Sequence, residues 1–170
     1  MNFLVYVPQE FKDETLSMVE LFLNKWGISY EIASHAAQEC RGAHGGKCKA
    51  TISISTANYL DYDGIIITDG KGIDANKTYE YRPFLDLVVK FNNSKKFLCA
   101  INNGVKVLAR ANIITGRRIS VNDKTASDFV RLFRGIPSAA GVEIAENIIT
   151  ANDNQGLETP LVKMFGRIEA

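Results

Sequence analysis

The chain has 170 residues, of which 46% are hydrophobic and 23% charged, the composition of an ordinary globular domain and not of a disordered, fibrous or membrane-spanning chain. Twenty Lys and Arg against nineteen Asp and Glu give a formal net charge of +1, which excludes the strong single-sign field that attracts nucleic acid or an anionic membrane. We expect one domain over residues 1–170, with neither nucleic acid nor membrane as a partner.

The first part of the chain alternates apolar runs of strand length with segments of helical period. Residues 3–7 are nearly all apolar, as in a strand buried on both faces, and Pro8 ends the run because proline cannot donate to a sheet. A helix is predicted up to Gly27, because apolar residues recur there every three or four positions. A second strand is predicted over residues 29–34.

The middle of the chain contains a polar, alternating stretch at residues 39–54, whose glycines predict a small hairpin at the edge of the sheet. Beyond this stretch the alternation of strands and helices resumes. The remaining predicted elements are strands over residues 64–68, 96–101, 141–145 and 148–150, and helices over residues 79–91, 105–111, 125–133 and 159–165.

This order of elements predicts an α/β fold. It is a three-layer sandwich whose mostly parallel central sheet carries helices on both faces, flavodoxin-like in arrangement, with the small hairpin at its edge. Ligands of such sheets bind outside the carboxyl ends of the strands. Four loops follow predicted strands at that end and form the candidate site: residues 9–14, His35, residues 69–72 and residues 102–104.

The loop after the fourth strand has the pattern of an elbow, a short glycine-containing turn that holds one side chain above the N-terminus of the next helix. The residue held there is Asn102, and an amide is a poor nucleophile. Cys99 lies three residues earlier, inside the strand, where its thiol is expected to face the packing of the sheet. The sequence therefore identifies no catalytic residue at the elbow.

Several blocks of the chain match a family pattern. Residues 41–45 read R-G-A-H-G, similar to a G-x-H-G hairpin, and residues 100–104 read A-I-N-N-G, similar to an elbow A-I-C-H-G. Residues 62–67 with Gly70 are similar to a D-A-L-V-L-P-G-G strand block. These blocks, with the first loop and second strand, resemble the ThiJ/PfpI family of intracellular protease I-like proteins. The resemblance implies a fold of the class I glutamine amidotransferase-like type.

The departures from the family pattern lie at the elbow. The family carries Cys and then His there, where this chain carries Asn102 and Asn103. The family also holds an acid from the first loop against the cysteine, and the matching position is Thr15, with Glu14 beside it as a possible acid. By resemblance, the backbone N–H groups of Gly70 and Asn103 face an oxyanion. The pocket that the resemblance implies comprises Glu14, Thr15, Asp69, Gly70, Asn102, Asn103 and Gly104.

Two other constellations are open alternatives. Residues 70–75 fit the G-x-G-x-x-A spacing of a dinucleotide site, but no acid follows about twenty residues later to hold a ribose. Cys40, His44 and Cys48 form a C-x3-H-x3-C set suited to a soft metal, with His35 or Glu39 as a fourth ligand. Packing is the favoured role of these residues, and we predict no metal and no cofactor.

The elbow substitutions lead us to expect a divergent or non-catalytic member of the family, which binds a small molecule or a peptide through Asn102 and Asn103. The alternative is an active hydrolase, a peptidase or a deglycase-type enzyme acting on reactive carbonyls, with Cys48 as nucleophile or a water activated by Glu14. Three cysteines and no signal peptide predict a cytoplasmic protein. The family resemblance implies a homodimer or a larger homo-oligomer.

Overall fold

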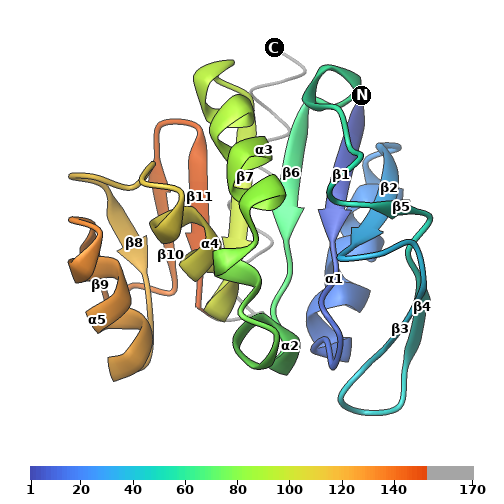
Figure 1. Cartoon of the computed structure of the whole chain (residues 1–170), viewed down its shortest axis with the longest axis horizontal. Coiled ribbons are helices and arrows are strands. Elements are labelled where there is room, and N and C mark those ends of the chain that lie inside the picture. The colour runs from blue at the N-terminus through green and yellow to red at the C-terminus, as the bar shows by residue number, and fades with distance from the viewer. Residues whose placement is uncertain (153–170) are drawn as a thin grey trace.

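A seven-stranded sheet forms the centre of the computed structural model, which describes residues 1–152 (Figure 1). The strand order is β10-β11-β7-β6-β1-β2-β5, and every neighbouring pair is parallel except β10 with β11. The strands are β1 (Asn2–Tyr6), β2 (Ser29–Ser34), β5 (Ile52–Ser53), β6 (Gly64–Ile67), β7 (Phe97–Ile101), β10 (Val142–Ala145) and β11 (Ile148–Ala151).

Helices cover both faces of this sheet. Successive strand side chains point to opposite faces, so Phe3 of β1 packs in the apolar cluster under α1, whereas Leu4 packs in the cluster under α3 and α4. The predicted three-layer sandwich is thereby confirmed. Within residues 1–152 the structure contains no helix long and apolar enough to cross a bilayer. The helices are α1 (Asp13–Lys25), α2 (Lys71–Ala75), α3 (Arg82–Asn93), α4 (Val105–Arg110) and α5 (Lys124–Leu132), with one-turn 3₁₀ helices η1 (Tyr59–Asp61), η2 (Thr78–Glu80) and η3 (Asn102–Gly104).

The predicted hairpin is also present. It consists of β3 (Glu39–Arg41) and β4 (Lys47–Lys49), which form an antiparallel sheet of their own, while β5 joins the edge of the main sheet. The helix predicted over residues 79–91 is divided, because η2 comes first and α3 begins only at Arg82. The helix predicted over residues 159–165 lies outside the described residues.

The sequence analysis missed one pair of strands. β8 (Arg118–Ser120) and β9 (Ile136–Ser138) form a parallel two-stranded sheet on either side of α5 in the chain. Each strand has only three residues, which is too short for an alternating pattern to stand out.

The crevice of the sheet lies between β1 and β6. From β1 the chain passes through α1 to β2 on one side, whereas β6 lies on the other side, and ligands of open sheets bind where connections diverge in this way. Here the loop after β1 touches α2 by backbone contact. The Gly72 N–H donates to the Gln9 carbonyl at 3.0 Å, and a Cβ on Gly72 would lie 2.4 Å from that same oxygen. Only glycine permits so close an approach.

Gly72→Ala is expected to lower the free energy of unfolding by about 1–3 kcal/mol, because the new methyl group must displace the Gln9 carbonyl. Gly141→Ala is the matched control, since its added carbon meets nothing within 4 Å. It should leave that free energy unchanged or raise it by up to about 1 kcal/mol. Urea denaturation followed by circular dichroism measures both. Equal stabilities would mean that the two loops separate at little cost.

Candidate functional site

The elbow predicted after the fourth strand is the one-turn helix η3, which leads from β7 into α4. Asn102 adopts the left-handed conformation, with φ of +48°, a region that asparagine tolerates better than most residues. Gly104 is buried, and a Cβ there would lie 3.1 Å from both the Ile67 carbonyl and its side chain. The elbow is therefore pressed against the end of β6.

The Asn102 side chain points at a buried carboxyl group. Its Nδ2 donates to Asp69 Oδ2 at 2.6 Å, and Asp69 is only 4% exposed. Burial raises the pKa of Asp69, while the hydrogen bonds from Asn102 and from the Thr15 hydroxyl oppose that rise. The acid that faces the elbow thus comes from the loop after β6, and Thr15, at the position where relatives carry their acid, lies against it.

Asn103 binds the Gly70 backbone through both ends of its amide. Its Oδ1 accepts from the Gly70 N–H at 3.2 Å, and its Nδ2 donates to the Gly70 carbonyl at 2.8 Å. The expectation that the Gly70 N–H faces an oxyanion is therefore wrong, because the Asn103 side chain occupies that donor. The same Nδ2 also donates to Asp74 Oδ2 at 3.0 Å, and Asp74 Oδ1 accepts from Lys106 at 2.5 Å.

The sequence did not predict that Asp74 and Lys106 lie at this site. The Lys106 side chain is 8% exposed, and its ammonium group lies 5.9 Å from the centre of the Tyr79 ring. The sequence does contain one signal for this pair, a lysine within the apolar run of residues 105–109. A lysine buried in such a run is expected to have an acidic partner.

The hairpin turn is held by one carboxylate. Asp13 accepts the His44 N–H on Oδ1 at 3.0 Å and the Gly46 N–H on Oδ2 at 2.7 Å, and these bonds keep the pKa of Asp13 below its usual value. A Cβ on Gly42 or on Gly46 would overlap this carboxylate, at 2.2 Å and 2.4 Å. Gly42 of the motif at residues 41–45 and the adjacent Gly46 thus make room for Asp13, which fixes the turn that carries His44.

Glu14 pairs with His44 and not with the elbow. Glu14 Oε1 lies 2.7 Å from His44 Nδ1, and both side chains are exposed. The pKa of Glu14 is lowered, first by its own backbone N–H at the start of α1 and then by His44. In a neutral imidazole, donation of the Nδ1–H to the carboxylate would leave the other ring nitrogen as an acceptor.

Most of the predicted pocket residues line one groove, which has a volume of about 730 Å³. Four of its expected members, Asp69, Gly70, Asn102 and Asn103, line it. Thr15 and Gly104 are buried, and Glu14 does not line the groove but is hydrogen-bonded to His44, which does. The sequence analysis missed the far wall, which β8 and β11 bring into place from distant parts of the chain. The remaining lining residues are Glu10, Lys12, Ala43, His44, Lys71, Asp74, Asn122, Asp123 and Asn152.

The cysteines lie away from this groove. Cys40 and Cys48 face each other across the hairpin and are buried in the cluster under α1, and burial raises the pKa of Cys48 to about 12. The buried Cys99 has a pKa raised to about 12 for the same reason. The structure therefore supports neither Cys48 as nucleophile nor a metal set that combines the two thiols with the exposed His44. Among residues 1–152 no group of three His, Cys, Asp or Glu side chains is placed to hold a metal.

The dinucleotide alternative is also contradicted. A pyrophosphate would need free backbone N–H groups at the start of α2. Those of Gly70, Lys71 and Gly72 are already donated, to Asn103 Oδ1, to the Glu10 carbonyl at 3.2 Å and to the Gln9 carbonyl at 3.0 Å. His35 lies outside this groove, in a second hollow described below.

Comparison with known proteins identifies the family. A sequence model described as the DJ-1/PfpI family matches residues 1–161. An uncharacterised protein of Methanocaldococcus jannaschii is 30% identical over 151 residues, covering 87% of this chain and 72% of its own. The protein named putative cysteine protease YraA of Bacillus subtilis is 27% identical over 155 residues, covering 91% of this chain and 90% of its own.

Solved structures agree on the fold. The ThiJ/PfpI domain protein of Brachyspira murdochii superposes with a TM-score of 0.88 at 19% identity, over 99% of this chain and 95% of its own. At that identity the likeness speaks to architecture alone. It supports the flavodoxin-like, mostly parallel sheet described above.

Asp69→Asn tests the burial of the carboxyl group at the elbow. A carboxyl whose pKa is raised by folding stabilises the fold only while it is protonated, so the stability of the natural protein relative to Asp69→Asn should fall as pH rises above about 4. Urea denaturation at a series of pH values measures it.

Asp13→Asn is the control with the opposite sign. Because the pKa of Asp13 is lowered, the natural protein should have a higher free energy of unfolding than Asp13→Asn above about pH 4. This difference should disappear as pH falls below that value. The same pH dependence for both variants would contradict the assignment of Asp69 as the buried acid.

Proposed function

This chain belongs to the DJ-1/PfpI family, and we propose that it is a member that binds a small ligand in the elbow groove without covalent catalysis. The observation that carries the proposal is the use of both elbow amides inside the protein. Asn102 is bound to Asp69, and Asn103 is bound to Gly70 and Asp74. Neither is a nucleophile, and the three thiols are buried elsewhere.

The charges around the groove favour a polar ligand that carries both signs. Lys12 and Lys71 line it together with Glu10 and Asp123, and asparagine side chains line it as well. A short peptide or an amino-acid-like molecule has a carboxylate, an ammonium group and amides that match these partners. The name of the Bacillus subtilis relative, "putative cysteine protease YraA", supports peptides as the first class to test.

A second candidate function rests on the Glu14–His44 contact of 2.7 Å at the rim of the groove. A carboxylate that holds one imidazole nitrogen leaves the other able to accept a proton from water, and the hydroxide formed would attack the carbonyl carbon of a bound peptide. The C–N bond would then break, and the leaving amine would take the proton back from the imidazolium. This hydrolase would need no cysteine. It would act on peptides or on reactive carbonyl compounds.

Turnover measurements separate the two functions. The natural protein is expected to show no hydrolysis of fluorogenic peptides and no consumption of small 2-oxoaldehydes above buffer, with or without a thiol-alkylating reagent. His44→Gln is assayed beside His35→Gln, a matched substitution of the other exposed histidine. Turnover that His44→Gln abolishes and His35→Gln retains would establish the second candidate and overturn the first.

Binding is measured on the same samples by ligand-observed NMR with short peptides. The double variant Asn102→Cys, Asn103→His should release the Gly70 N–H from its side-chain partner and supply a thiol and an imidazole at the elbow. Thiol-dependent turnover in this variant alone would support a pocket that lacks only its nucleophile. Absence of both binding and turnover in the natural protein would contradict the proposal.

A further inference from the structure

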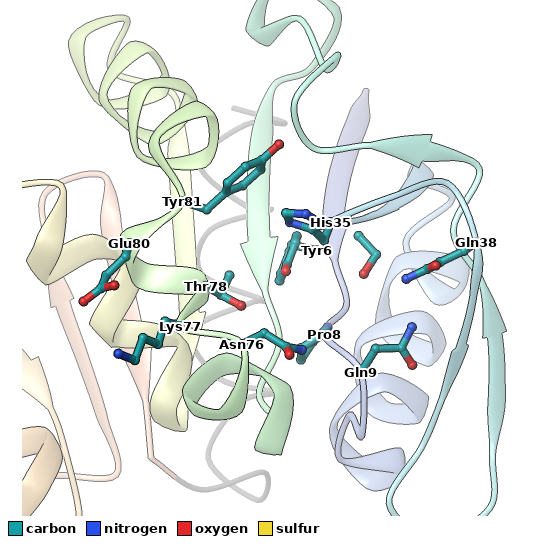
Figure 2. A pocket seen from close by; sticks show the side chains of 11 residues that line it. Tyr6, Pro8, Gln9, His35, Gln38, Asn76, Lys77, Thr78, Glu80 and Tyr81 are labelled. Carbon is teal, nitrogen blue, oxygen red and sulfur yellow. The ribbon is translucent and has the colours of Figure 1, made fainter.

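A second hollow opens on the other side of the backbone contact between Gln9 and Gly72. Its volume is about 740 Å³, within the usual range for small-molecule sites, and it shares no lining residue with the elbow groove. The ends of β1 and β2 form one wall, and residues 76–81 form the other (Figure 2). Neither the family motif nor the elbow accounts for it.

The floor of this hollow is made of hydroxyl groups. Tyr6 is 2% exposed, packs its ring 4.4 Å from that of Phe84, and reaches the hydroxyls of Ser34 and Thr78. The Ser34 hydroxyl donates a hydrogen bond to the Val7 carbonyl at 2.6 Å, and the Thr78 hydroxyl donates one to the Gly72 carbonyl at 3.4 Å. Both hydroxyls therefore present lone pairs at the floor. Burial raises the pKa of Tyr6 to about 12, so its own hydroxyl remains a donor.

The upper wall is aromatic. His35 and Tyr81 come from opposite sides and lie with their ring centres 4.4 Å apart, inclined by 52° (Figure 2). Each ring is partly or fully exposed at the mouth of the hollow. Because the two rings are inclined they form no common plane, but the Tyr81 ring alone offers an aromatic surface against which the C–H face of a ring compound can pack.

The rim supplies two amide side chains that have no hydrogen-bond partner among the described residues. The Gln38 and Asn76 side chains make no hydrogen bond within residues 1–152, whereas the Gln9 amide is bound to β3. An amide both donates and accepts, which suits a hydroxyl group that does the same. Lys77 and Glu80 place one charge of each sign there, so the hollow has no net charge for an anion or a cation to follow.

We propose that this hollow binds a neutral polyhydroxylated ring, a sugar, with the ring packed on Tyr81 and its hydroxyls bound by Gln38, Asn76 and the floor around Tyr6. A purely apolar ligand would cover the Gln38 and Asn76 amides at the rim without giving them a hydrogen-bond partner, which costs free energy. A phosphate or carboxylate would meet only one lysine, beside one glutamate. The ring could belong to a free monosaccharide or to a nucleoside.

The test is a chemical-shift titration of the isotope-labelled full chain with glucose, ribose, adenosine and glucose 6-phosphate. We expect glucose or ribose, or adenosine if the source is a nucleoside, to shift the amide signals of residues 34–38 and 76–81. The signals of residues 102–104 at the elbow should stay in place. Glucose 6-phosphate should bind no more tightly than glucose.

Tyr6→Phe and Gln38→Ala should each weaken binding by about threefold to tenfold, the effect of one lost hydrogen bond. Asn122→Ala, in the elbow groove, is the control and should leave it unchanged. Circular dichroism confirms that each variant is folded. The proposal is overturned if none of the uncharged compounds shifts these signals, if Tyr6→Phe and Gln38→Ala both bind like the natural protein, or if only the phosphorylated sugar binds. Peptide binding at the elbow would be unaffected by any of these outcomes.

Discussion

The close backbone contact between the loop after β1 and the start of α2 is the constraint on which both hollows depend. Three successive bonds join the two segments: Lys12 N–H to the Asp69 carbonyl, and the N–H groups of Lys71 and Gly72 to the carbonyls of Glu10 and Gln9. Phe11 lies between Gly42 of the hairpin and Gly70. One strip of chain therefore ties together the first loop, the third loop and the hairpin, and it divides the carboxyl edge of the sheet into two separate spaces.

The elbow beside this strip of chain differs from the family pattern at several positions that contact one another. In the family pattern that the sequence resembles, a glycine stands where this chain has Asp69, and an acid stands at Thr15. The exchange keeps one carboxyl group beside the elbow but brings it from the other side of the crevice, where Asn102 can bind it. Asn103 in turn occupies the Gly70 N–H, the donor that a reacting carbonyl oxygen would need. The substitutions act together, since each supplies a partner for another.

Much of the fold could be predicted from the sequence, because buried parallel strands are apolar runs and glycines interrupt them. Residues 3–7, 64–68 and 96–101 are such runs, and the elbow at Asn102 followed from the turn after the last of them. The partners of individual side chains could not be predicted. Glu14 is adjacent in sequence to Thr15, the position where the family pattern has an acid, but the hairpin places His44 within hydrogen-bond distance of Glu14. The hydroxyl floor around Tyr6 gathers residues that lie up to 72 positions apart and carry no shared motif.

The two hydrogen bonds between the Asn103 side chain and Gly70 have a thermodynamic consequence for any ligand of the groove. A side chain held by Gly70, by Asp74 and through it by the enclosed Lys106 has little rotational freedom left to lose. Ordering flexible side chains is one of the main entropic costs of association, and a surface that is already ordered avoids that cost. The part of the groove around Asn103 should therefore need no rearrangement when a ligand binds, and the ordering cost should fall on the exposed Lys12 and Lys71 side chains.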